Sequence, residues 1–90
     1  MAQIGDLRRK IALGQYELTG HAKEEMEDDE FTIEDVKTAI YSGRIIARQR
    51  HGPGLRKLGV RGRAADGREL CLVCRLTESG LLRIITVFEA

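Results

Sequence analysis

The chain contains no tryptophan and few other aromatic residues. Only two Tyr and two Phe occur among its 90 residues, so Leu, Ile, Val and Ala must supply the core, with Phe31, Tyr41 and Phe88 as its few bulky side chains. Four aromatic rings are also too few for a surface on which single-stranded bases stack. The composition therefore predicts a compact aliphatic core.

A long apolar run is absent as well. A membrane-spanning helix needs about 18 apolar residues, and no such stretch occurs; residues 1–13 mix acidic and basic residues with apolar ones, unlike a signal peptide. We expect a cytoplasmic protein with no membrane partner. Since 90 residues can form one core and the sequence shows no repeat or linker, we expect one domain over residues 1–90.

Cysteine is scarce, and a second C-x-x-C motif is absent. Cys71 and Cys74 form the only such motif, whereas a structural zinc site needs two pairs of ligands. Both lie in a stretch with strand character, where residues i and i+3 point to opposite faces about 10 Å apart, too far for a disulfide. We predict free, packed thiols, no metal and no cofactor.

The two halves of the chain carry opposite charge. Residues 1–43 hold five Lys and Arg against ten Asp and Glu, and residues 44–90 hold ten against four. Six of the acids fall between residues 24 and 30, where helical spacing spreads them over a solvated surface. The basic second half indicates either an anionic partner or a complementary contact between the halves.

The acidic half predicts three helices. Apolar residues at near-helical spacing predict an added N-terminal helix over about residues 3–13, within the segment 1–14. Thr19 should cap a second helix that buries only a narrow apolar stripe. Thr32 with Asp35 resembles a capping box for a third helix over residues 33–42.

From residue 44 the apolar period changes to two residues and predicts four strands. Asp66-Gly67 and Ser79-Gly80 supply tight hairpin turns between the last three, so the strands should form an antiparallel meander. Residues 16–18 are too short for more than a strand fragment. The expected fold is α+β, with N-terminal helices packed on a four-stranded antiparallel sheet whose strands are residues 44–50, 57–64, 69–77 and 81–88.

Strand alternation predicts where the side chains point. In the last hairpin, the core side should hold Leu70, Leu72, Cys74 and Leu76 together with Leu82, Ile84, Thr86 and Phe88. In the first two strands, alternation collects the cations on one face, which predicts a single basic surface formed by Arg44, Arg48, Arg50, Lys57, Arg61 and Arg63.

The basic surface suggests RNA chemistry. Cleavage of RNA through its own 2′-hydroxyl needs a base, an acid and cations on the phosphate, all of which His and Arg supply without metal. His51 lies in a glycine-rich loop between Arg50 and Arg56, and His21 lies near a helix N-terminus whose dipole favours the neutral ring. Solvated or capping roles remain the alternative for both histidines. The candidate catalytic residues are His51, His21 and Arg61, and the candidate RNA-binding residues are Arg48, Arg50, Arg56, Lys57 and Arg63.

Several segments resemble a known family. Residues 16–22 read Tyr-Glu-Leu-Thr-Gly-His-Ala and are followed by Glu25-Met26, by Phe-Thr-Ile-Glu-Asp-Val at residues 31–36, by Gly-Arg-Ile-Ile at residues 43–46 and by Ile-Ile-Thr-Val-Phe at residues 84–88. This pattern resembles the family called domain of unknown function 4258, over about residues 15–88. That family in turn is similar to the RelE-type toxins, small bacterial α+β proteins.

The resemblance implies a toxin-like messenger RNA endoribonuclease that meets RNA or the ribosome and is held in check by a small antitoxin protein. Relatives with known activity commonly use Arg or Lys on the sheet and a Tyr or His near the C-terminus. This chain ends Phe88-Glu89-Ala90, so His51 or His21 would have to take that last role. The alternative is a non-catalytic module whose basic sheet docks RNA or an acidic protein partner.

Overall fold

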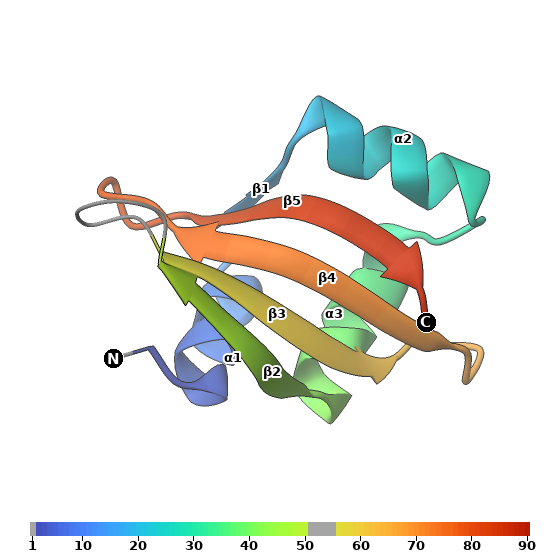
Figure 1. Cartoon of the computed structure of the whole chain (residues 1–90), viewed down its shortest axis with the longest axis horizontal. Helices are drawn as coiled ribbons and strands as arrows, with labels where there is room; N and C mark the ends of the chain where they lie inside the picture. The colour runs from blue at the N-terminus through green and yellow to red at the C-terminus, as the bar shows by residue number, and fades with distance from the viewer. Residues whose placement is uncertain (1, 51–55) are drawn as a thin grey trace.

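The computed structural model describes residues 2–50 and 56–90 as three helices and one five-stranded sheet (Figure 1). The strand order is β1-β5-β4-β3-β2. The α+β class predicted from the sequence is confirmed. In chain order the elements are α1 (Ile4–Ala12), β1 (Tyr16–Leu18), α2 (Gly20–Asp28), α3 (Ile33–Ser42), β2 (Arg44–Arg50), β3 (Arg56–Arg63), β4 (Glu69–Leu76) and β5 (Leu82–Glu89).

The core lies between the sheet and the helices, and all three helices contribute buried side chains to it. Helices α1 and α3 pack together on one face of the sheet, where α3 crosses β3 and β4, while α2 lies along β5 (Figure 1). Leucine, isoleucine and valine dominate the buried side chains. Phe31 is buried as expected, but Tyr41 and Phe88 are 48% and 42% exposed. The prediction that these two aromatic residues fill the core is therefore wrong.

Local signals place the helix starts correctly. The side chain of Thr19 accepts a hydrogen bond from the Ala22 amide at the start of α2, 3.1 Å away. At the start of α3, Thr32 and Asp35 form the predicted capping box. Thr19 and Thr32 each accept a hydrogen bond from a backbone amide that has no partner within its helix. None of the helices in the described residues is long and apolar enough to cross a membrane.

The sheet has five strands instead of the four predicted, and it is mixed. Residues 16–18 form β1, which pairs in parallel with residues 82–84 of β5. The backbone amide of Thr19 donates to the Ile84 carbonyl (3.0 Å) and extends this pairing. A three-residue strand has little propensity of its own, so its pairing depends on a partner far along the chain. The antiparallel arrangement of β2 to β5 is as predicted.

A β-bulge divides β2 into two segments that face opposite ways. Arg44 lies opposite Arg61, but Ile46 has no partner residue on β3, and Arg48 then lies opposite Leu58. Because successive residues alternate between the faces, one extra residue reverses all side chains beyond it. Arg48 therefore shares a face with the buried Leu58. The predicted single basic surface is wrong, since the arginines of β2 occupy both faces.

A second bulge has the same effect on β5. Ile85 has no partner residue on β4, so Thr86 lies opposite Val73 and Val87 lies opposite Leu72. Val87 is fully buried, and Phe88, the next residue, is mostly outside the core. The predicted core positions of Thr86 and Phe88 are therefore wrong.

Two glycines let α3 approach β3 closely. A Cβ atom at Gly62 would lie 2.0 Å from the Ala39 carbonyl oxygen, and one at Gly43 would lie 2.4 Å from the same atom. Gly43 has an extended backbone, so it is needed for space and not for a left-handed conformation. This contact fixes the position of the β2 start against β3.

Both cysteines are buried and free, as predicted. Burial raises the pKa of the Cys74 thiol to about 12, which keeps it protonated and unreactive at neutral pH.

Candidate nucleic-acid interface

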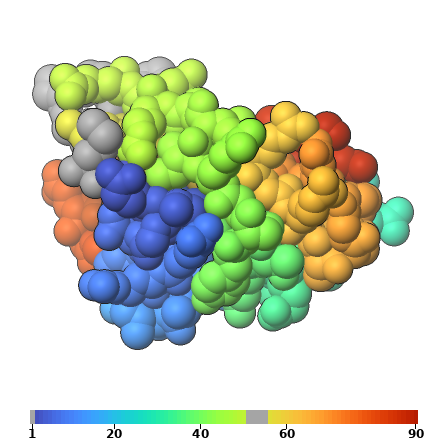
Figure 2. Space-filling model, turned by 90° about the horizontal axis from the view of Figure 1, so that it is seen from below, coloured from blue at the N-terminus to red at the C-terminus, as the bar shows by residue number. Residues whose placement is uncertain are grey.

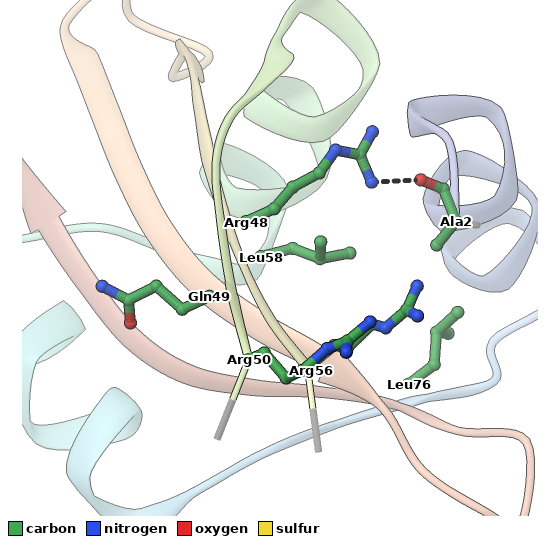
Figure 3. Close-up of a pocket in the computed structure, with 7 residues that line it drawn as sticks. All are labelled: Ala2, Arg48, Gln49, Arg50, Arg56, Leu58 and Leu76. Carbon is green, nitrogen blue, oxygen red and sulfur yellow. Dashed lines mark hydrogen bonds between the residues drawn. The ribbon is translucent and has the colours of Figure 1, made fainter. Parts of the chain in front are cut away.

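Three arginines gather where β2 ends and β3 begins. Arg48, Arg50 and Arg56 point to the same side of the hairpin, whereas Gln49 points to the other side (Figure 3). They surround a cavity of about 370 Å³. We call this site the arginine pocket.

The rest of the arginine pocket is mostly apolar. Leu58, which is 4% exposed, forms part of its lining together with Leu76 and Ala2, and Gln49 is the remaining lining residue. The Arg48 guanidinium donates a hydrogen bond through Nη1 to the Ala2 carbonyl oxygen, 2.7 Å away (Figure 3). This bond orients Arg48 and uses only one of the five N–H groups of its side chain.

The arginine pocket carries uncompensated positive charge. Within residues 2–50 and 56–90, no ion pair involves Arg48, Arg50 or Arg56. Guanidinium groups stay charged at every physiological pH, and their planar fork matches the oxygens of a phosphate. A concave site with three such groups suits an anion with several oxygens.

A second basic cluster lies at the other end of the same hairpin, about 13 Å along β2. Its cavity of about 290 Å³ is lined by Arg44, Arg61, Arg63 and Glu69, together with Ser42, Gly43 and Gly62. Here a carboxylate is part of the site. Arg61 hydrogen-bonds and pairs with Glu69, which raises the pKa of the arginine and holds the pKa of the Glu69 carboxyl below its usual value.

Two of the three cations of this second cluster, Arg61 and Arg63, already have partners in the protein. Arg63 donates through Nη1 to the Gly67 carbonyl oxygen, 3.0 Å away. Lys57, also predicted to bind RNA, is half-buried and lies opposite Gln49, on the face away from the arginine pocket. The eight predicted site residues are thus not one site: Arg48, Arg50 and Arg56 lie together, while Lys57, Arg61 and Arg63 lie on the opposite face.

Of the two predicted histidines, the structure describes His21, which lines neither cluster. The His21 side chain is 64% exposed, and its Nε2 atom lies 3.2 Å from Oε1 of Glu25 on α2. Helix α2 lies along β5, whereas the arginine pocket is formed mainly by β2 and β3, on the far side of β4 in the sheet. His51 lies outside the described residues.

Sequence reasoning missed the apolar half of the arginine pocket. Leu76 was expected in the core, yet it is 37% exposed. The only feature of the sequence that indicated this exposure was its position at the end of a predicted strand. Ala2 gave no sign at all, because the position of the N-terminal segment depends on tertiary packing. Among the described residues, no cluster of three or more His, Cys, Asp or Glu side chains is arranged to hold a metal ion.

One comparison with known proteins is positive. The family described as Domain of unknown function (DUF4258) matches residues 18–89. The resemblance recognised from the residue patterns is confirmed, and the similarity to RelE-type toxins stays a prediction. No curated protein and no solved structure matched the chain.

Proposed function

The chain belongs to the family described as Domain of unknown function (DUF4258), and from its arginine pocket we propose that it is a metal-independent endoribonuclease acting on messenger RNA in the cytosol. One observation carries the proposal. Arg48, Arg50 and Arg56 surround a cavity and have no carboxylate partner among the described residues. Such a site matches the charge and the shape of the RNA backbone.

The dimensions of the pocket fit a short piece of RNA. Its volume of about 370 Å³ is near the lower end of the range for small-molecule sites, about 300–1,000 Å³. The guanidinium groups would each contact a phosphate of the RNA backbone, and the apolar side chains of Leu58 and Leu76 would contact a sugar or a base. Phosphate contacts of this kind usually fix the position of a nucleic acid on a protein, and other contacts reach its sugars and bases.

The arginines also suit the chemistry of cleavage. When the 2′-hydroxyl attacks the phosphate, negative charge grows on the phosphate oxygens, and fixed cations stabilise it. We propose His51, which follows Arg50 directly in the chain, as the general base. We assign this role to His51 and not to His21, because His21 lies on α2 beside β5 and outside the pocket lining. The expected similarity of the DUF4258 family to RelE-type toxins would imply the same activity and, with it, control by a small antitoxin.

A cleavage and binding assay on single-stranded RNA, with and without ribosomes, tests the proposal. The combined change of Arg48, Arg50 and Arg56 to Gln should abolish binding at physiological salt. The matched control changes three cations elsewhere, Arg9, Lys23 and Arg75, to Gln and removes the same net charge. Equal losses in the two triple variants would show that only overall charge matters, and would contradict the proposed site.

The two histidines provide the catalytic test. His51→Ala should lower the cleavage rate by about 10²-fold and leave RNA affinity nearly unchanged, whereas His21→Ala should have no effect. Binding without any cleavage by the wild type would instead favour a non-catalytic RNA-binding module. That second candidate has one observation in its favour: no histidine or carboxylate lines the arginine pocket among the described residues.

A further inference from the structure

The two edges of the sheet differ in how far other elements cover them. Beyond the short pairing with β1, the edge of β5 is covered by α2. There Oε1 of Glu25 accepts a hydrogen bond from the Val87 amide, and Oδ2 of Asp29 accepts one from the Glu89 amide, both at 3.1 Å. These carboxylates occupy the place that the carbonyl groups of a further strand would take.

The opposite edge, formed by β2, has no such cover in the described part of the chain. Six of its seven residues are exposed, and no hydrogen bond reaches its backbone from any described element other than β3. In the space-filling view, the yellow-green residues of β2 form a rim beside the blue N-terminal segment (Figure 2). A strand edge in this state presents N–H and C=O groups that can pair with another strand.

The charge of β2 decides which kind of strand fits. Its sequence contains Arg44, Arg48 and Arg50 and no carboxylate. A second copy of this chain would bring arginine next to arginine, and like charges on neighbouring strands are unfavourable. We propose that β2 accepts an extended acidic segment of a partner protein as a sixth strand of the sheet.

The alternation of β2 sets the pattern of that segment. On the side of the arginine pocket, acidic residues spaced two apart would lie opposite Arg48 and Arg50. On the other side, the segment meets Ala47 and Gln49, so small or apolar residues fit there. The partner segment therefore alternates carboxylates with uncharged residues over about six positions.

Such a segment would also close the arginine pocket, because it uses the same guanidinium groups as the RNA site. This regulatory consequence rests on the proposed function, whereas the strand pairing itself does not. An acidic strand and RNA should therefore compete for the protein.

The test uses a ten-residue peptide in which Glu and Val alternate, with the intact protein and amide hydrogen exchange as readout. The peptide should bind and slow exchange at the β2 amides by at least about tenfold, with no change in α2. Arg48→Gln/Arg50→Gln should weaken binding about tenfold, and the control Arg9→Gln/Lys23→Gln should not. A peptide methylated on alternate backbone nitrogens should lose binding, since it cannot complete the ladder.

Three results would overturn the inference. The first is that the peptide binds without slowing hydrogen exchange at the β2 amides, and the second is that a peptide with its Glu residues clustered at one end binds equally well. The third is that oligouridine slows exchange at the β2 amides as strongly as the peptide does. Protection of β2 that rises with protein concentration alone would also overturn it and indicate self-pairing. If the peptide binds as described and RNA does not bind at all, the proposed function fails while this inference stands.

Discussion

Asp35 is the one charged side chain buried in the described part of the chain, with 7% exposure. Its Oδ2 atom accepts from the Thr32 amide (2.8 Å), and its Oδ1 atom accepts from the Ala65 amide (3.0 Å). The side chain thus joins the start of α3 to the turn between β3 and β4. Capping of one element and attachment of another depend on the same carboxylate.

We predict that Asp35→Ala lowers the free energy of unfolding by about 1–3 kcal/mol, because it leaves two amides without an acceptor. Urea denaturation measures the change. The control is Asp28→Ala, which removes an exposed carboxylate and should cost less than about 0.5 kcal/mol. Similar losses in both variants would mean that Asp35 acts only through its charge.

Gly62 provides a steric test of the contact between α3 and β3. Gly62→Ala should destabilise the protein by about 1–3 kcal/mol, because the new methyl group would collide with the Ala39 carbonyl oxygen. Gly5→Ala is the matched control, since nothing lies within 4 Å of the added Cβ in α1. It should stabilise the helix by about 0.5–1 kcal/mol. Thermal denaturation measures both changes: the melting temperature should fall for Gly62→Ala and rise for Gly5→Ala. Shifts in the same direction would contradict this account.

The pair of Arg61 and Glu69 predicts a dependence on pH. The hydrogen bond and charge of Arg61 lower the pKa of Glu69 in the folded state, so the pair stabilises the protein above the unfolded pKa of about 4.3. This contribution is lost as the pH falls through the lower, folded-state pKa. Glu69→Gln should therefore be less stable than wild type at neutral pH and equally stable in strong acid. A stability difference that persists unchanged at about pH 2 would point to lost packing instead.

At the scale of elements, α2 acts as an edge cover for the sheet. Glu25 and Asp29 are one helical turn apart, which is the reason both carboxylates reach the same strand. Glu25→Ala and Asp29→Ala should each cost about 1 kcal/mol and speed hydrogen exchange at the Val87 and Glu89 amides. The exposed neighbour Glu24 provides the control, because Glu24→Ala should change neither quantity. Unaltered exchange at both amides in the two variants would rule out a covering role.

Elements that depend on neighbouring residues could be predicted from the sequence. The capping residues Thr19 and Thr32 lie within one turn of the amides they satisfy, and the glycines of the turns at Gly67 and Gly80 have the left-handed backbone that such turns need. The pairing of β1 could not be predicted, because its hydrogen bonds depend on β5. Local chemistry is visible in a sequence, and distant pairing is not.

The bulges explain the errors in the candidate site. Both occur at a pair of adjacent isoleucines, Ile45-Ile46 and Ile84-Ile85. A period of two cannot place both members of such a pair in the core, so each pair was a sign of an irregular strand. In β2 the remaining residues are polar except for Ala47, and no buried pattern marks the change of register. The composition of the basic site was therefore predictable, but its division between two faces was not.

At the scale of the whole molecule, the main acidic run and the arginine pocket are separated in space, although Arg83 of the basic half pairs with Glu17 of the acidic half. The acidic helix α2 lies along β5, and the arginine pocket lies across the sheet on β2 and β3. An approaching polyanion is therefore attracted to one side of the protein and repelled by the other. The near-neutral total charge conceals this polarity.

This separation predicts how binding responds to salt. If three phosphates occupy the arginine pocket, the logarithm of RNA affinity should fall with the logarithm of salt concentration with a slope of about −2. Filter binding at several salt concentrations measures it. Arg56→Gln should reduce the steepness by about 0.7, and Arg9→Gln should leave it unchanged. A slope near zero for the wild type would show that the pocket does not hold phosphates.

The cover of α2 on β5 also limits how many molecules can add to the sheet by strand pairing. Growth of a fibril by strand addition requires every subunit to offer two available edges, one toward each neighbour. In the described part of this chain, β2 is open, while Glu25 and Asp29 block most of the other side. Strand addition at β2 would therefore stop after one partner. The chain can form a one-to-one complex by this route without becoming the seed of an endless aggregate.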